Sequence, residues 1–228
     1  LRRAIVPEFV PKVYDIDTEN RVFIMEDVSY LKISRFQLLK GKQFPLLGEH
    51  MGRYMAGNNF FTSEYYLDSR LFRDLSVRFM NPTMREIMDT GMFLTSVTPE
   101  DTVGHPLDPD FQRFSRAICA DPDVLISRQR LRHLFMSKGE CMIHGDLHTS
   151  NVFVNDEETK VIDMEYTFCG PFSYDLGYFL QNFLTQYAAA MFRPFDSENE
   201  REAYKVYCLF IIKDTYLSYC KYFCRHFK

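Results

Sequence analysis

The sequence predicts an α+β fold with one β-hairpin ahead of a mainly helical domain. Near the N-terminus, two runs rich in β-branched and aromatic residues flank a polar TEN turn, a pattern typical of a hairpin. After Ser29, apolar residues recur at helical spacing through most of the chain. Short strand-like runs return only in MIHGD, NVFVN and KVIDM. The chain after Ser29 is therefore expected to be helical with a small β-rich insert.

The hairpin is predicted from VPKVYDID and RVFIMED, which together cover Val10 to Asp27. The next element is an amphipathic helix from about Phe44 to Glu64, since its apolar residues follow i, i+3, i+4 spacing. A further helix is expected to start at NPTMREIMDTGMF, where Asn81 would supply an N-cap oxygen and Pro82 would suit the first turn.

The second half repeats these signals. A polar, proline-containing stretch from Thr95 to Pro109 predicts a loop. Residues 110–138 are expected to be mostly helical, with a break at ADPD. There, Asp121 and Pro122 repeat the signal of a capping residue followed by a proline, which marks the start of a new helix. Helices are expected again from Tyr174 to the end of the chain.

Composition and charge exclude several classes of protein. The chain has 31 acidic and 27 basic side chains, a net charge of −4, so it lacks the basic surface that nucleic-acid binding requires. No stretch is apolar for the length of a membrane span, and no membrane partner is expected. The six cysteines show no CxxC pairing and predict reduced thiols, typical of a cytoplasmic protein. The first residue is Leu1 and not Met, so the chain is expected to begin within a longer protein.

Three polar residues in the β-rich insert predict phosphoryl-transfer chemistry. Asp146 and Asn151 are five residues apart, and Asp163 follows Asn151 by twelve, after an apolar run. This order and spacing match a kinase catalytic loop, in which an Asp engages the substrate hydroxyl, and the metal-binding Asp that comes after it. Each motif alone is more often a solvated turn, but the three together favour a site for Mg²⁺, which prefers oxygen ligands.

Nearby polar residues are expected to support this loop. We interpret His144 as a structural residue that holds the loop backbone, and His148 as a surface or supporting residue. Asp175, in GPFSYDLG, is expected to accept backbone N–H bonds from the catalytic loop without contacting the substrate.

The segment HGDLHTSN resembles the catalytic loop of the aminoglycoside phosphotransferase and choline kinase branch of the protein-kinase-like fold, which phosphorylates small-molecule hydroxyls. Within that branch, VIDMEYTFCGPFSYDLGYFLQNFL is most similar to the methylthioribose kinases, which carry Asp-x-Glu in place of DFG. VFIMEDVS and FMNPTMREIMDTGMF are similar to the hinge and the NP-containing helix of that family. The resemblance extends from Val10 to about Ala189.

This resemblance implies transfer of the ATP γ-phosphate to the 1-hydroxyl of 5-methylthioribose, a step in methionine salvage. It makes Asp146 the catalytic Asp, with Asn151 beside it in the catalytic loop. Asn151 and Asp163 become Mg²⁺ ligands, with Glu165 as a second carboxylate beside the metal. Met25, Glu26, Asp27 and Val28 would form the hinge, whose backbone groups would pair with the adenine of ATP.

The resemblance also implies missing parts. The family's glycine-rich loop, strand Lys and Glu partner would precede Val10, and its sugar-contacting arginines would follow Lys228. The chain is thus expected to hold the end of an N-lobe with the hinge at residues 1–28, and the C-lobe at residues 29–228. Phosphoryl transfer by this chain alone is expected to be undetectable.

Two alternatives stay open at this stage. The enzyme could phosphorylate another acceptor of the branch, such as an aminoglycoside, choline or homoserine, or the chain could be a non-catalytic pseudokinase module. The C-terminal segment YCLFIIKDTYLSYCKYFCRHF carries apolar residues on more than one face. It fits either a buried C-lobe helix or a subunit contact in a homodimer.

Overall fold

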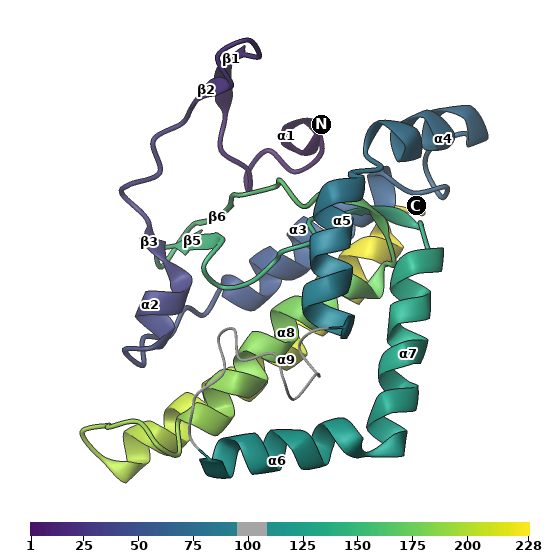
Figure 1. Ribbon diagram of the computed structural model, residues 1–228. Coiled ribbons are helices and arrows are strands. Elements are labelled where there is room, and N and C mark those ends of the chain that lie inside the picture. Colours follow the sequence, from purple (N-terminus) through teal and green to yellow (C-terminus); the bar gives the residue numbers. More distant parts are fainter. Residues whose placement is uncertain (95–108) are drawn as a thin grey trace.

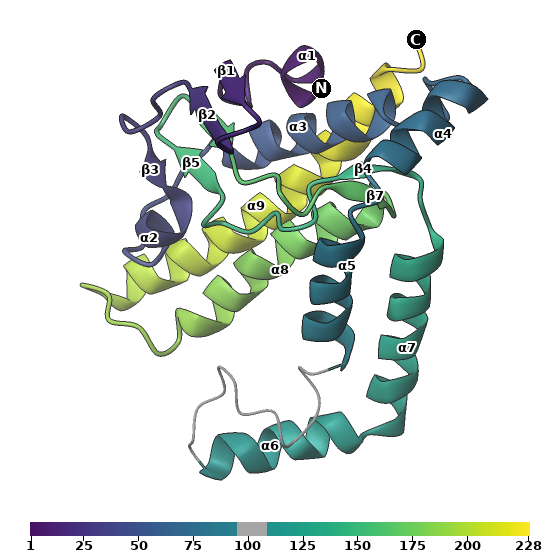
Figure 2. The same ribbon diagram turned by 45° about the horizontal axis from the view of Figure 1, so that its top comes forward.

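The computed structural model describes residues 1–94 and 109–228, so the loop expected from Thr95 lies almost wholly outside the described residues. The structure confirms the predicted α+β fold: most of the described elements are helices, and the strands form three small sheets (Figures 1 and 2). The helical body carries the core.

The predicted hairpin is present near the N-terminus, after a short helix α1 (Arg2–Ile5). Strands β1 (Val13–Asp17) and β2 (Val22–Met25) pair antiparallel, with Asp17 opposite Val22 at the turn. The hairpin lies apart from the helical body in Figure 1. Apolar side chains on it, such as Ile16 and Phe23, are exposed. The hairpin is therefore a surface feature of the described structure.

The main helical contact joins α3 (Leu47–Phe61) and α9 (Glu198–Arg225), and α8 (Ser173–Ala189) packs along α9 (Figure 2). Helix α3 begins three residues later and ends three residues earlier than predicted. The helices α3 and α9 approach closely at Gly52, where a Cβ atom would lie 2.8 Å from the Thr215 carbonyl oxygen. Only glycine leaves room for the α9 backbone at this position.

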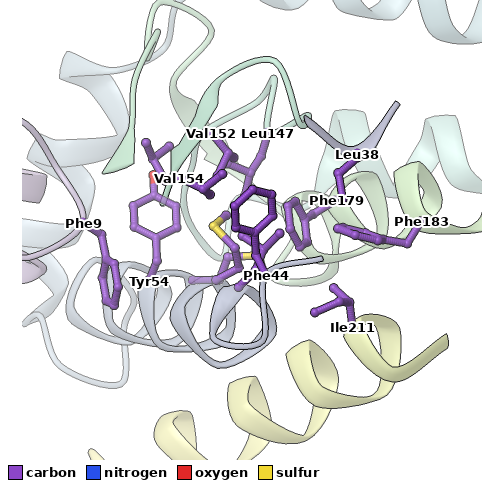
Figure 3. Close-up of a cluster of buried hydrophobic side chains, with 14 of the residues drawn as sticks. Phe9, Leu38, Phe44, Tyr54, Leu147, Val152, Val154, Phe179, Phe183 and Ile211 are labelled. Atoms are coloured by element: carbon purple, nitrogen blue, oxygen red, sulfur yellow. The ribbon is translucent and has the colours of Figure 1, made fainter. Parts of the chain in front are cut away.

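The core between these helices also holds the segment expected to carry the chemistry. Leu147, Val152 and Val154 lie in one buried cluster with Phe179 and Phe183 of α8 (Figure 3). Full burial of an apolar side chain of this size contributes about 1.5–3 kcal/mol. The loop around Asp146 is therefore anchored to this core by Leu147 and by the strand residues that follow it.

The remaining strands form two small sheets. Strand β4 (Cys141–Ile143) pairs antiparallel with β7 (Phe168–Gly170). The second sheet has the order β3–β5–β6, with β3 at Lys32–Ile33, β5 at Val152–Val154 and β6 at Thr159–Val161. The sequence patterns predicted β4, β5 and β6 but not β3 or β7. The loop at residues 144–151 thus leads from the first sheet to the second.

A helical arm extends from the core, and two of its helices begin at the predicted prolines, Pro82 and Pro122. Helix α5 (Pro82–Asp89) leads into the π-helical turn η1 (Thr90–Leu94), and α6 (Pro109–Ala120) is followed by α7 (Pro122–Ser137). The Asp121 side chain accepts a hydrogen bond from the backbone N–H of Asp123, as expected of an N-cap. Helices α2 (Ser34–Leu38) and α4 (Ser69–Arg78) were not predicted.

Two further expectations can be compared with the structure. No two of the six cysteines are bonded to each other. Among residues 1–94 and 109–228, no helix has both the length and the apolar character that a membrane span needs.

Helix α9 buries Tyr204, Cys208 and Ile211 and exposes Val206 and Phe210 on its other side. It is a core helix of the described structure, and a homodimer through its outer face stays a prediction.

Candidate functional site

Asp146 lies at the centre of a small hydrogen-bond network in the loop between β4 and β5. Its Oδ1 accepts a hydrogen bond from the Tyr178 hydroxyl at 3.2 Å, and its Oδ2 accepts one from Asn151 Nδ2 at 3.3 Å. The Nε2 atom of His148 lies 3.3 Å from the same Oδ2. About a quarter of the Asp146 side chain is exposed, at 26%. The carboxylate is therefore held in place and still reachable by a ligand.

The neighbours of Asp146 also set its charge state. The hydrogen bond from His148 lowers the pKa of Asp146 below its usual value, against the opposing effect of burial. The same bond raises the pKa of His148. Asp146 is therefore ionised at neutral pH and can accept a hydrogen bond from a substrate hydroxyl. A weak base of this kind is adequate for phosphoryl transfer, where positioning contributes more than early proton removal.

His144 and Asp175 hold the loop from behind. The His144 ring donates from Nε2 to the Ile162 carbonyl oxygen at 2.8 Å, and its Nδ1 accepts from the Asp146 backbone N–H at 3.2 Å. Burial and the positive charge of Arg2 lower the pKa of His144 to about 3, so the ring is neutral. Asp175 accepts backbone hydrogen bonds from His144 at 2.5 Å and Gly145 at 3.0 Å. These are the contacts that the predicted supporting roles require.

Asp163 lies just past the end of β6 and has a φ angle of +65°. The strand-like run KVIDM therefore forms a strand only up to Val161, where β6 ends. A residue in the left-handed region interrupts strand alternation, and Asp is one of the few side chains that tolerate it. Both carboxylates are exposed.

The loops of Asp146 and Asp163 are in direct contact. A Cβ atom on Gly145 would lie 2.6 Å from the Tyr166 carbonyl oxygen, and Gly145 has a φ angle of +89°. Burial raises the pKa of Tyr166, and the charges of Asp146, Glu165 and Asp163 raise it further. Tyr166 therefore lies where the loops of Asp146 and Asp163 meet.

Residues at this surface could hold a divalent cation. Asn151 uses its Nδ2 on Asp146, and within the described residues its Oδ1 accepts no hydrogen bond. In the part of the chain that the structure describes, no three His, Cys, Asp or Glu side chains cluster closely enough to bind a metal by themselves. Mg²⁺ commonly takes one or two carboxylates and completes its shell with water and phosphate oxygens. Asn151, Asp163 and Glu165 supply oxygen donors of this kind, and their joint binding of Mg²⁺ stays a prediction.

The predicted hinge follows β2 and turns toward the C-lobe. The Glu26 backbone N–H donates to the Lys12 carbonyl oxygen, and its Oε1 lies 3.8 Å from the buried Lys160 Nζ. Asp27 accepts hydrogen bonds from the backbone N–H and the hydroxyl of Ser29. Val28 is buried, and Met25 ends the strand. Adenine binding by these backbone groups stays a prediction.

The sequence patterns missed two contacts at the site. Tyr178 is three residues after Asp175 and so lies one helical turn along α8, a spacing that could have indicated it. Asn81 was expected to cap α5 but has a φ angle of +43°, and its side chain makes no cap hydrogen bond. It donates instead to the carbonyl oxygens of Glu165 at 2.7 Å and Thr167 at 3.1 Å. The NP segment thus supports the Asp163 loop.

The chain is similar to known phosphotransferases. Residues 94–207 match the model of the phosphotransferase enzyme family. Methylthioribose kinase from Geobacillus sp. (strain WCH70) is 35% identical over 191 residues, which make up 84% of this chain and 46% of that protein. Methylthioribose kinase from Bacillus anthracis is 37% identical over 179 residues, or 78% of this chain and 45% of that protein. The chain thus spans about half the length of the curated relatives it matches.

Solved structures of a glucosamine kinase have a similar fold. One crystal form aligns with a TM-score of 0.55 and 12% identity, covering 98% of this chain and 56% of that chain. A complex of glucosamine kinase with glucosamine, ADP and inorganic phosphate gives a TM-score of 0.53 at 14% identity, with coverage of 98% and 56%. At this level of identity the likeness concerns the fold alone.

Proposed function

Because the chain belongs to the phosphotransferase enzyme family, we propose that it carries the catalytic and metal-binding loops of an ATP-dependent kinase that phosphorylates methylthioribose at its 1-hydroxyl. The observation that carries this proposal is the network around Asp146. Its ionised carboxylate is fixed by Tyr178 and Asn151 and adjoins the loop of Asp163 and Glu165.

In the proposed reaction, Asp146 accepts a hydrogen bond from the acceptor hydroxyl and takes its proton as the oxygen attacks the γ-phosphorus of ATP. The bond between the γ-phosphorus and the β,γ-bridging oxygen breaks, and ADP leaves. Asn151, Asp163 and Glu165 would hold Mg²⁺, which neutralises the charge on the phosphate oxygens when it is bound. Asp175 and His144 keep the loop backbone in position and do not contact the substrate. The hinge at residues 25–28 would place the adenine.

Support for methylthioribose as the acceptor comes from the relatives, which are methylthioribose kinases at 35–37% identity. The wider family includes kinases for other small molecules, so acceptor identity needs a direct test. The experiment should use the full-length open reading frame that contains this chain, in parallel with the 228-residue chain itself.

The test measures ADP release with methylthioribose, kanamycin, choline, homoserine and glucosamine as acceptors. We expect methylthioribose to give the highest kcat/KM by at least about tenfold, a difference of roughly 1.4 kcal/mol in barrier. A higher value for any other acceptor would overturn the assignment. ADP release with none of them would instead favour a non-catalytic module.

Three variants test the residue roles. Asp146→Asn should lower kcat and leave ATP affinity within a few-fold, because Asp146 faces the acceptor. Asp163→Asn should weaken Mg²⁺-dependent ATP binding. The control is Asp156→Asn, since Asp156 is an exposed acid on the β5–β6 turn that lies 3.8 Å from Lys42. Equal loss of ATP binding in the Asp146 and Asp163 variants would show that the roles are wrongly assigned.

A further inference from the structure

Helix α1 places a buried guanidinium group behind the candidate site. Arg2 is 6% exposed and donates three hydrogen bonds, each from a different nitrogen. Nε bonds Asn58 Oδ1 at 2.9 Å, Nη1 bonds Thr167 Oγ1 at 2.7 Å, and Nη2 bonds the Ile143 carbonyl oxygen at 2.7 Å. These distances are in the normal range for strong hydrogen bonds from a cation.

The three acceptors belong to three different parts of the site. Ile143 ends β4 and immediately precedes His144 in the catalytic loop. Thr167 is two residues beyond Glu165 and immediately precedes β7. Asn58 lies in α3, the central helix of the core. A single side chain therefore joins the catalytic loop and the Asp163–Glu165 loop to the core.

The charge of Arg2 is not used in a direct ion pair. Within the described residues, no carboxylate oxygen lies within 4.0 Å of it. A buried cation is costly unless its N–H groups are satisfied. Here the cost is offset by three well-formed hydrogen bonds. Burial raises the pKa of the nearby Asp175, and the positive charge of Arg2 acts in the opposite direction.

We propose that Arg2 is a positioning residue of the phosphotransfer site, which fixes the loop of Asp146 relative to the loop of Asp163 and Glu165. This inference rests on the proposed function. Phosphoryl transfer depends on alignment, and a displacement of about 1 Å between reacting groups can cost about a hundredfold in rate. A guanidinium group can reach three separated acceptors at once, whereas the ammonium of Lys is a compact donor on a flexible stem.

The test compares Arg2→Met, Arg2→Lys and Thr167→Val in the full-length open reading frame, with Arg3→Met as the matched control. Arg3 is on the same helix but is exposed, and it donates to the Pro7 and Val10 carbonyl oxygens. Thr167→Val removes one acceptor while Arg2 stays in place, so it serves if the Arg2 variants do not fold. Steady-state kinetics and thermal unfolding are measured for every variant.

We expect Arg2→Met to lower kcat at least about tenfold while KM for ATP changes less than about threefold, because the binding groups remain and only their alignment is lost. Arg2→Lys should recover only part of this loss, and Thr167→Val should show a smaller fall in kcat. A double variant that combines Arg2→Met with Thr167→Val should have a kcat little lower than that of Arg2→Met alone, because both changes remove the contact between Arg2 and Thr167.

Two results would overturn the proposal. In the first, wild type is active, and Arg2→Met or Thr167→Val lowers the unfolding temperature but leaves kcat unchanged. The contact would then serve stability only. The other is an equal fall in kcat in Arg3→Met. A wild-type enzyme without phosphotransfer activity would reject the proposed function itself, and the positioning role with it.

Discussion

Gly145 gives a sharp test of how the two loops of the site meet. Its φ angle is +89°, which side chains other than glycine rarely adopt. In Gly145→Ala the new Cβ atom would lie 2.6 Å from the Tyr166 carbonyl oxygen and 2.9 Å from the Tyr166 Cβ. The substitution therefore meets both a conformational penalty and a backbone clash.

The two penalties can be estimated separately. A left-handed conformation costs an alanine about 1–2 kcal/mol. Relief of the clash needs the catalytic loop or Tyr166 to move by several tenths of an ångström, and overpacking of this kind costs about 1–3 kcal/mol. Gly145→Ala should lower the free energy of unfolding by about 2–5 kcal/mol, or the unfolding temperature by roughly 5–15 °C.

Gly177, in the same DLG segment as Asp175, is the matched control. It lies inside α8, and nothing is within 4 Å of the position that its Cβ atom would take. Alanine is more favourable than glycine inside a helix, so Gly177→Ala should raise the free energy of unfolding by about 0.5–1 kcal/mol. The two Gly-to-Ala changes thus have opposite expected signs.

The measurement is urea and thermal unfolding of the 228-residue chain and both variants, followed by circular dichroism. An unfolding free energy for Gly145→Ala within about 0.5 kcal/mol of wild type would refute the close contact between the loops, since surface substitutions without such features stay in that range. A Gly177→Ala variant as unstable as Gly145→Ala would show that glycine is needed there for another reason.

Three other outcomes are expected. Tyr178→Phe removes the hydroxyl donor from Asp146 and should raise the pKa of that carboxylate, which ¹³C NMR titration can follow; an unchanged titration would exclude the bond. The Asp146–His148 pair stabilises the fold most between about pH 3.8 and pH 6.5. The pKa of Asp146 is lowered in the folded state, so its contribution to stability is lost as the pH falls through that pKa. The pKa of His148 is raised, so its contribution is lost as the pH rises through that pKa. The free energy of unfolding should therefore change less between pH 5.5 and pH 8.5 in His148→Gln than in wild type. An equal change in both proteins would argue against the pair. Phe179→Ala should cost about 3–5 kcal/mol in urea unfolding, since this side chain is fully buried beneath the catalytic loop, and a cost below about 1 kcal/mol would contradict that packing.

The sequence alone determined the features that depend on neighbouring residues. The order and spacing of Asp146, Asn151 and Asp163 identified the candidate loops, because these residues lie on short segments whose geometry is local. Asp121 and Pro122 correctly placed the start of α7 for the same reason. The β-branched and aromatic runs around the polar turn were enough to predict both strands, even though they are exposed.

Tertiary structure decided the contacts that join distant segments. Asn81 donates to the carbonyl oxygen of Glu165, which is 84 residues away in the chain. The role of Arg2 depends on partners 56, 141 and 165 residues away in the chain. No local pattern specifies such partners, because a buried polar group takes whichever acceptors the packed core brings within reach.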